Sequence, residues 1–331
     1  MASYLTRLAA MLGRHTSGPA AALTLLLVLM VPYTATAQTC TASGPTLLLG
    51  TVNPYANTTT TTSGNGSYTC TNPTAAVVTG YGCVSVGTGT GGTSATNRTL
   101  VLNTSTIPIQ ITSGGASSQI GNGTSYPMYG PVAITIPANG STNGTFPLVV
   151  TLPPPSPAPP PGSYTSSFAG TDAQFIYYTG PTTTTCATLN AGTHLTAQAN
   201  FSVSATIATQ CKVSASSMAF PITSVLKVAV NATATVSITC NTATPVTIGL
   251  DNGATGTGPT TRKMKSGTTN AITYGIYRDA AATLPWGNTA GTNTASFGSG
   301  TGTVTAYGQV PAQTSPPPGS YSDIVNVVIT Y

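Results

Sequence analysis

The chain has 331 residues, of which only 4% are charged, and a formal net charge of +5. With so few charged residues, the chain has neither a basic patch that would bind nucleic acid nor a polybasic membrane anchor. A content of 40% hydrophobic residues argues against a disordered chain. We therefore expect two folded domains of ordinary size, whose surfaces are polar through threonine, serine, asparagine, glutamine and glycine.

The N-terminal segment, residues 1–37, has the features of a signal peptide. Arg7 and Arg14 precede an apolar run over residues 20–31, and an A-x-A motif follows at residues 35–37. An uncleaved anchor is the less favoured alternative, because the apolar run is too short to span a bilayer. The pattern predicts cleavage before Gln38 and export of the remaining chain across a membrane.

Beyond the predicted cleavage site, the sequence favours β-strands. Helix-forming residues are scarce, and short alternating runs recur between clusters of glycine, proline, asparagine and serine. In residues 201–207 the apolar side chains stand at every second position, and the same alternation appears in residues 325–331. The chain is therefore predicted to be all-β, with a sandwich architecture.

Several landmarks of the first half return in the second half in the same order. Arg98 is matched by Arg262, and the string Pro-Pro-Pro-Gly-Ser-Tyr at residues 159–164 returns at residues 316–321. Two diverged copies of one domain explain this order. We expect an N-terminal domain over residues 38–196 and a C-terminal domain over residues 197–331.

All six cysteines lie beyond the predicted signal peptide, and an even number in an exported chain indicates disulfides. Cys40 and Cys70 lie 30 residues apart, and Cys211 and Cys240 lie 29 apart at matching places in the two copies. The simplest pairing gives each domain one equivalent bridge and leaves the remaining two cysteines to a bridge private to the first domain. The predicted disulfides are Cys40–Cys70, Cys211–Cys240 and Cys83–Cys186.

Few residues of the mature chain suit catalysis or metal binding. It contains no glutamate, its acids are Asp172, Asp251, Asp279 and Asp323, and His194 is its one histidine. General acid–base catalysis needs a positioned titratable pair, and a metal site needs clustered ligands. An enzyme is therefore the least favoured class, and we expect no cofactor and no metal.

The second half resembles a known domain. It carries Asp-Asn-Gly at residues 251–253, Ile-Thr-Tyr-Gly-Ile-Tyr-Arg-Asp at 272–279 and Leu-Pro-Trp-Gly at 284–287. These strings, in this order, resemble the spore coat protein U domain, the pilin-type domain of archaic, Csu-type chaperone–usher pili. The first half resembles it more loosely, because it keeps the cysteine pair and Arg98 but lacks the Leu-Pro-Trp-Gly string.

The resemblance implies tandem immunoglobulin-like sandwiches, the C-terminal one lacking its last strand. It also implies three partners: a periplasmic pilus chaperone, an outer-membrane usher, and a next pilin subunit that donates a strand by β-augmentation. Ordinary core residues are the alternative interpretation of the final strand. The candidate groove residues are Val325, Val327, Ile329 and Tyr331.

The resemblance further implies export through the inner membrane and the periplasm to the cell surface or out of the cell, and it suggests a place at the tip of the fibre. After the predicted cleavage only Gln38 and Thr39 precede Cys40, which is too short a segment to serve as a donor strand. The donor-like run at residues 197–209 lies inside the chain, where we expect it to be the first strand of the second domain or a linker. We therefore expect a tip adhesin; the alternative is a secreted coat or matrix protein that no usher assembles.

An adhesive loop is the last expectation from the sequence. An uncharged string rich in aromatic, methionine and proline residues is a candidate binding surface, although Met128 and Tyr129 also suit the core of a strand. The sequence does not identify a ligand. The candidate loop residues are Tyr126, Pro127, Met128, Tyr129 and Pro131.

Overall fold

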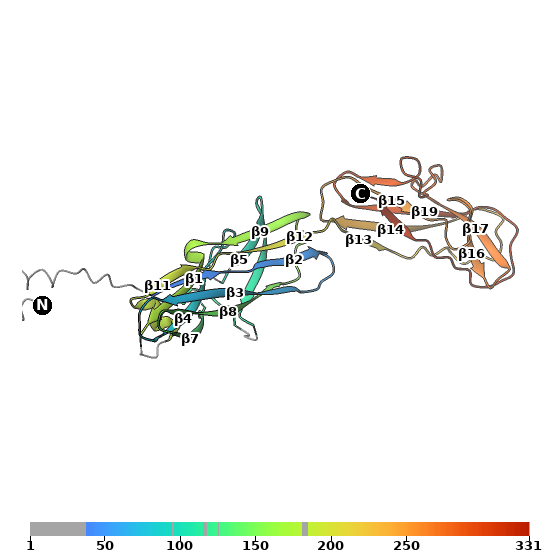
Figure 1. Cartoon of the computed structure of the whole chain (residues 1–331). Helices are drawn as coiled ribbons and strands as arrows, with labels where there is room; N and C mark the ends of the chain where they lie inside the picture. Colours follow the sequence, from blue (N-terminus) through green and yellow to red (C-terminus); the bar gives the residue numbers. More distant parts are fainter. Residues whose placement is uncertain (1–37, 95, 115–117, 125, 181–184, 331) are drawn as a thin grey trace, which may run out of the picture.

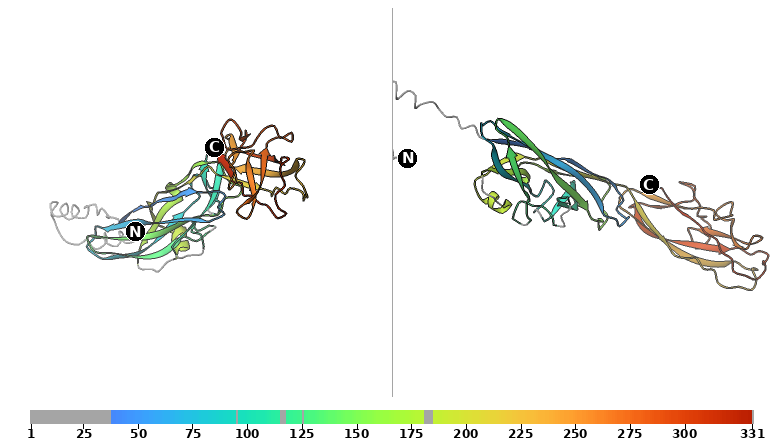
Figure 2. Two further views of the ribbon diagram at one scale, coloured as in Figure 1. Left: turned by 90° about the vertical axis from the view of Figure 1, so that its right-hand side faces the viewer. Right: turned by 60° about the horizontal axis from the view of Figure 1, so that its bottom comes forward.

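The computed structural model describes residues 38–330 except 95, 115–117, 125 and 181–184, so the predicted signal peptide and Tyr331 lie outside the described residues. Within the described part, strands dominate and the predicted all-β class is confirmed. The ribbon forms two bodies that lie end to end (Figure 1), and two further views show the same arrangement (Figure 2).

The first body contains strands β1 to β12 in two sheets. One sheet has the order β1-β3-β8-β6-β5-β9-β12-β2, and the other has the order β11-β10-β4-β7. A short helix, α3 (Cys186–Ala191), packs beside β7 and β10. The strands are β1 (Thr39–Ser43), β2 (Thr46–Val52), β3 (Thr60–Asn72), β4 (Val78–Val86), β5 (Arg98–Leu102), β6 (Ser105–Thr112), β7 (Tyr129–Ile136), β8 (Gly140–Leu152), β9 (Gly162–Phe168), β10 (Ala173–Thr179), β11 (Leu195–Gln198) and β12 (Phe201–Ile207).

Alternation along the strands builds the first core. In β8, Phe146, Leu148, Val150 and Leu152 are buried, while the residues between them are half-buried at the other face. This is the two-residue period of a strand with one face against a core. The stacked rings of Tyr68 and Phe175, 4.4 Å apart between centroids, join the two sheets of this body.

The second body contains two smaller sheets with the orders β13-β14-β19-β17-β16 and β18-β15-β20. Its core surrounds Trp286, which is fully buried and donates a hydrogen bond from Nε1 to the carbonyl of Ile248 at 2.9 Å. The strands are β13 (Cys211–Ala215), β14 (Val230–Cys240), β15 (Val246–Leu250), β16 (Arg262–Ser266), β17 (Asn270–Tyr277), β18 (Ala295–Phe297), β19 (Thr301–Val310) and β20 (Val327–Thr330).

A buried arginine marks the same place in both bodies. Arg98 donates to the carbonyls of Val86 and Gly87, each at 2.7 Å, where β4 ends. Arg262 donates to the carbonyls of Leu250 at 3.2 Å and Asp251 at 2.8 Å, where β15 ends. Burial lowers the pKa of Arg98 to about 10 and also lowers that of Arg262. The shared environment supports the interpretation of the two halves as copies of one domain.

The disulfides of the structure are the three pairs that the repeat predicts. Cys40 and Cys70 face each other across β1 and β3, as Cys211 and Cys240 do across β13 and β14, with a Cα–Cα distance of 4.0 Å in both. The third bridge joins Cys83 in β4 to Cys186 at the start of α3, with a Cα–Cα distance of 5.8 Å. The equivalent bridges hold the first strand of each body to its neighbour.

The boundary between the folded bodies differs from the predicted one. Strand β12 was expected to open the second domain or to link the two, but it pairs with β2 and β9 and lies within the first core. The physical reason is its burial: all four of its inward side chains, at residues 201, 203, 205 and 207, are enclosed by the first body. The boundary therefore falls after Ile207 rather than at Ala197.

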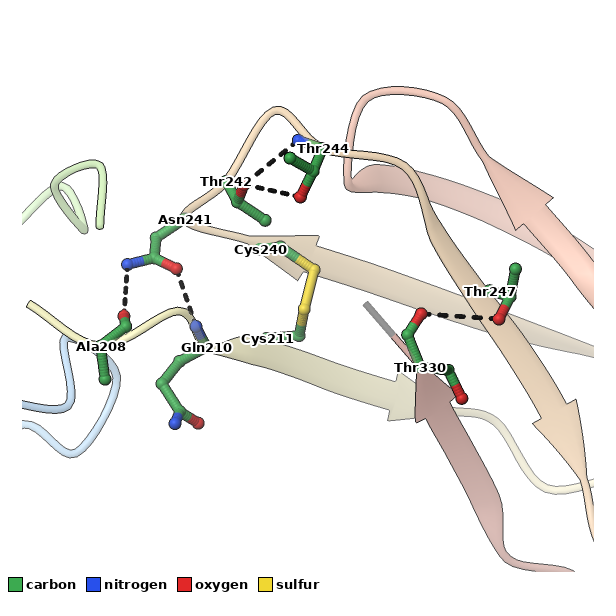
Figure 3. The surroundings of a disulfide bond; sticks show 9 residues. All are labelled: Ala208, Gln210, Cys211, Cys240, Asn241, Thr242, Thr244, Thr247 and Thr330. Carbon is green, nitrogen blue, oxygen red and sulfur yellow. Dashed lines mark hydrogen bonds between the residues drawn. A yellow bond between two sulfur atoms is a disulfide. The ribbon is translucent and has the colours of Figure 1, made fainter. Parts of the chain in front are cut away.

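A short connection of residues 208–210 joins the bodies, and Asn241 secures it (Figure 3). The Asn241 side chain accepts a hydrogen bond from the amide of Gln210 at 2.8 Å and donates to the carbonyl of Ala208 at 2.9 Å. It also donates to the carbonyl of Pro159 in the first body at 3.1 Å. A residue of the second body thus binds both the connection and the first body.

Candidate functional site

The first body shows how the last-strand position of this fold is filled. Strand β12 lies between β9, to which it is antiparallel, and β2, to which it is parallel. Its inward residues Phe201, Val203, Ala205 and Ile207 have exposed fractions of 7%, 0%, 2% and 1%. An apolar strand held on both edges therefore completes this core.

Two pairs of matching contacts locate the equivalent edge in the second body. Thr165 bridges to Val101, three residues after Arg98, and Ser322 bridges to Lys265, three residues after Arg262. One residue earlier, the Tyr164 hydroxyl donates to the carbonyl of Pro160 at 2.9 Å, and the Tyr321 hydroxyl donates to that of Pro317 at 2.7 Å. Residues 321–325 of the second body therefore correspond to the part of β9 that β12 covers.

At this edge the second body has an open groove of about 410 Å³. One wall consists of residues 215–218 and Phe220, and the opposite wall consists of residues 321–325 and Val327. The floor includes Val236, Leu250 and other apolar core residues. Among the described strands, β15 alone pairs with β20, so the outer edge of β20 has no partner strand within that part of the chain.

The groove residues are more exposed than their counterparts in the first body. Met218 and Phe220 are half-buried, whereas Leu47 and Leu49, at the matching distance from the first cysteine of the repeat, are buried. Apolar side chains that a strand covers in one body thus stand uncovered in the other.

Two of the four predicted groove residues line this groove. Val325 and Val327 line the groove, and Ile329 lies opposite Ile248 in the pairing of β20 with β15. All three are half-buried and pack against the second core, so the alternative interpretation as core residues also describes them. Tyr331 lies outside the described residues.

A polar network ties the 321–326 segment to the turn after β15. The Tyr274 hydroxyl donates to Asp323 Oδ2 at 2.8 Å, and the amide of Ala254 donates to Asp323 Oδ1 at 3.0 Å. Asp251 accepts hydrogen bonds from the amide of Asn326 at 3.0 Å and from its side chain at 2.6 Å. Residues 274 and 323 lie 49 positions apart, so no local sequence pattern predicts this pairing.

Two pKa shifts follow from this network. Burial of Asp251 acts to raise the pKa of its carboxyl, but hydrogen bonds from Gly253 and Asn326, with the nearby Arg262, hold it below its ordinary value. Burial and the hydrogen bond to Asp323 raise the pKa of Tyr274. The tyrosine therefore acts as a hydrogen-bond donor in this wall of the groove.

The predicted adhesive loop is only partly exposed. The expectation that Met128 contributes to an adhesive surface is wrong, because its side chain is buried in a small core with Ile176, Leu189 and the Cys83–Cys186 disulfide. Tyr129 begins β7 and packs half-buried against the first core. Tyr126 is half-buried, and Pro127 and Pro131 are exposed.

A set of exposed apolar side chains that the sequence analysis missed lies at the end of the first body away from the second. Val77 precedes β4, Tyr178 lies opposite Tyr81 in β4, and Leu195 lies opposite Tyr177 in β10. Figure 1 shows β11, which begins at Leu195, at this far end. Their exposed fractions are 62%, 37% and 46%, and the isolated positions of these residues in the sequence gave no signal.

Groups suited to metal binding are absent from the described residues, where no cluster of three or more histidine, cysteine, aspartate or glutamate side chains forms. His194 is half-buried, with Nδ1 2.9 Å from the carbonyl of Gly192. In the same described part of the chain, no helix has the length and apolar character that crossing a membrane requires.

The chain is similar to a protein family, to a related protein and to several solved structures. A family model described as the Spore Coat Protein U domain matches residues 25–171 and 197–328. Protein U of Myxococcus xanthus is 31% identical over 117 residues, which are 33% of this chain and 65% of that protein. The match therefore spans less than two thirds of that relative's length.

Solved structures share the fold at low sequence identity. A chain of the CsuC–CsuE chaperone–tip adhesion subunit pre-assembly complex, from the archaic chaperone–usher Csu pili of Acinetobacter baumannii, matches with a TM-score of 0.50 and 15% identity. The match covers 88% of this chain and 100% of that one. The CupB6 tip adhesin of Pseudomonas aeruginosa gives a TM-score of 0.31 at 12% identity over 88% and 94% of the two chains. Since the family model matches most of both halves, the chain belongs to the Spore Coat Protein U domain family.

Proposed function

We propose that the chain is the tip subunit of a chaperone–usher pilus and that its second domain takes up a β-strand from the next pilin subunit. The observation that carries this proposal is the groove of the second body, at the position that β12 fills in the first. An incoming strand would gain backbone hydrogen bonds along the open edge, and its alternate side chains would enter the apolar groove.

The first domain supplies an internal example of such a donor. The second family match begins at residue 197, so β12 belongs by sequence to the second copy of the domain, yet it completes the core of the first. The chain thus complements its first domain with its own strand. The groove of the second domain is left for another chain, first the periplasmic chaperone and then, at the usher, the next subunit.

The pairing of the donor-like strand, β12, supports a position at the tip of the fibre. Both edges of β12 pair within the first body, and the Cys40–Cys70 bridge fixes β1 to β3. Neither strand is therefore available to a neighbouring subunit. In the proposed fibre the first domain faces outward, in keeping with export through the periplasm to the cell surface and with an adhesive rather than a catalytic role.

For the adhesive surface we propose the outer end of the first domain rather than the loop at residues 126–131. Val77, Tyr178 and Leu195 are exposed there, at the end of the sheet remote from the second domain. Exposed apolar side chains that gather at one end of a domain mark interaction surfaces. We therefore expect the ligand to present an apolar surface.

A secreted coat or matrix protein is the second candidate function. The description of the matching family as a spore coat domain favours it, together with the similarity to Protein U of Myxococcus xanthus. The two candidates differ over the groove, because a coat protein without an usher has no need of an incomplete sandwich.

The test adds a second copy of residues 195–209 to the C-terminus of the full chain through a short glycine-rich linker. The tether gives the strand a high effective concentration at the groove. Trp286 is the one tryptophan of the chain and lies in the second core, so its fluorescence follows the unfolding of the second domain alone.

We expect the added strand to raise the midpoint of the Trp286 transition by roughly 10 °C, because it covers the apolar groove. The matched control carries aspartate at the four inward positions of the added copy and should leave the midpoint unchanged. Equal midpoints for both fusions, with a monomeric and stable bare chain, would favour the coat-protein candidate instead.

A further inference from the structure

A polar pair in the wall of the second domain's groove has no counterpart in the first domain. Arg98 lies opposite Ile109 in the pairing of β5 with β6, and Arg262 lies opposite Tyr274 in that of β16 with β17. Tyr274 therefore stands where the first domain has Ile109. By the bridges at Thr165 and Ser322, Asp323 likewise stands where the first domain has Ser166.

The strand that fills the first groove shows which of its residues meets this position. Val203 of β12 lies opposite Ser166 on one side and opposite Leu47 on the other. Both Val203 and Ser166 are buried under the completed sheet, at 0% and 1% exposure. A strand in the same register in the second groove would place its central inward residue over Asp323.

Covering Asp323 has a different consequence from covering Ser166. Asp323 accepts hydrogen bonds from the Tyr274 hydroxyl and from the amides of Ala254 and Ile324, and this half-buried residue lines the open groove. A carboxylate has about four acceptor sites, so water can satisfy the remaining one while the groove is open. An aliphatic side chain placed there would exclude that water and supply no donor, which is costly for a charged group.

The nearest cation does not remove this requirement. Arg262 attracts Asp323, but it donates its hydrogen bonds to the backbone carbonyls of residues 250, 251, 259 and 286. Within the described residues, the donors to Asp323 are therefore Tyr274 and nearby backbone amides.

We propose that the partner of the second groove is an extended segment with apolar inward residues and one hydroxyl-bearing residue, serine or threonine, at the position that faces Asp323. This inference rests on the proposed function and specifies the chemistry of its partner. It also makes the two grooves distinct: the first holds a strand with valine at position 203, and the second binds such a strand less tightly than one with threonine there.

Two synthetic peptides test this proposal on the full chain, whose first groove its own strand already fills. One peptide has the sequence of residues 195–209, and the other differs only by V203T. Valine and threonine have nearly the same shape, so the comparison isolates the hydroxyl, and an entirely apolar site would favour valine. Dissociation constants come from the fluorescence of Trp286, because residues 195–209 contain no tryptophan.

We expect the threonine peptide to bind about tenfold more tightly than the valine peptide. One hydrogen bond to a charged acceptor increases the affinity by about this factor. In Asp323→Ser, which restores the residue of the first domain, the preference should pass to valine. Tyr274→Phe keeps the carboxylate but removes one of its donors, so the preference for threonine should grow; this second variant serves if Asp323→Ser does not fold.

The outcomes separate this inference from the function on which it rests. If both peptides bind and valine binds equally well or more tightly, the groove accepts a strand, but the proposed role of Asp323 is overturned. If neither peptide changes the Trp286 signal, and the tethered strand described above does not stabilise the second domain either, the proposed function fails as well.

Discussion

Tyr164 and Tyr321 occupy the same place in the two domains, and each donates its hydroxyl proton to the carbonyl four residues before it. Tyr164 is fully buried beneath β12, whereas Tyr321 is half-buried in the wall of the groove. A strand thus covers this tyrosine in the first domain, while its counterpart in the second domain lies in an open groove. The first domain is therefore an internal reference for the second.

The first prediction concerns Val203 at the centre of β12. In V203D a carboxylate would enter the first core without a partner, so the strand should leave its position and expose the apolar groove. We expect at least about 3 kcal/mol loss of first-domain stability, and aggregation at concentrations where the natural chain is monomeric. Light scattering and thermal unfolding measure both effects.

The matched control is S202D, one residue earlier on the exposed face of the same strand. It adds the same charge and should change the unfolding midpoint only slightly. Similar losses for the two variants would mean that the alternation of β12 does not govern its attachment.

The second prediction concerns the buried arginines. Methionine in place of Arg262 would fill similar space but would leave the carbonyls at residues 250, 251, 259 and 286 without their donor. Unsatisfied buried acceptors are costly, so we expect a loss of about 3 kcal/mol or more in the second domain, read from Trp286 fluorescence.

Arg98→Met provides the internal comparison, because Arg98 has the equivalent place in the other domain. It should lower the stability of the first domain and leave the Trp286 transition close to that of the natural chain. A large shift of this transition in Arg98→Met would show that the two domains unfold as one unit.

The third prediction concerns acid. The pKa of Asp251 is lower in the folded chain than its ordinary value, so its contribution to stability is present above the unfolded pKa of about 3.9 and is lost as the pH falls through the folded value. We expect the free energy of unfolding of the second domain to fall below about pH 4 as the bonds to Asn326 weaken.

The variant D251N should lose less stability over the same range, because an amide does not titrate. D172N in the first domain, where Asp172 accepts from the amides of Thr88 and Gly89, should leave the acid dependence of Trp286 unfolding unaltered. An unchanged slope in D251N would assign the acid sensitivity to other groups.

The fourth prediction concerns adhesion. Serine at Val77, Tyr178 and Leu195 together should reduce attachment of the protein to an apolar surface several-fold without loss of stability, since all three side chains are exposed. Adsorption to a hydrophobic sensor surface measures the effect. Leu48→Ser is the control, because Leu48 is 63% exposed on β2 rather than at the outer end. Equal reduction by the control would contradict a localised adhesive surface.

The sequence predicted those features that repeat or that follow from spacing. The cysteine pairs and the matching arginines came from the order of landmarks in the two halves, and the all-β class came from the alternation of side chains. The same alternation identified β12 as a strand, but it could not indicate which domain the strand joins, because a strand with one apolar face suits either core.

The adhesive candidates show the same limit. Met128 lies in an apolar string, and such a string has the same appearance whether it forms an exposed loop or covers a disulfide. Asp323 and Tyr274 are far apart in the sequence, so their hydrogen bond depends on the register of the sheet, which no local pattern specifies. The contacts that distinguish the two grooves are of this long-range kind.

The continuity of β12 with β13 through residues 208–210 has a mechanical consequence. Tension applied to the second domain along the long axis would pull β12 lengthwise from its C-terminal end. Its bonds to β2 and β9 would then bear the load together in shear instead of opening one after another. The same strand that closes the first core thus makes the junction resist stretching along the long axis.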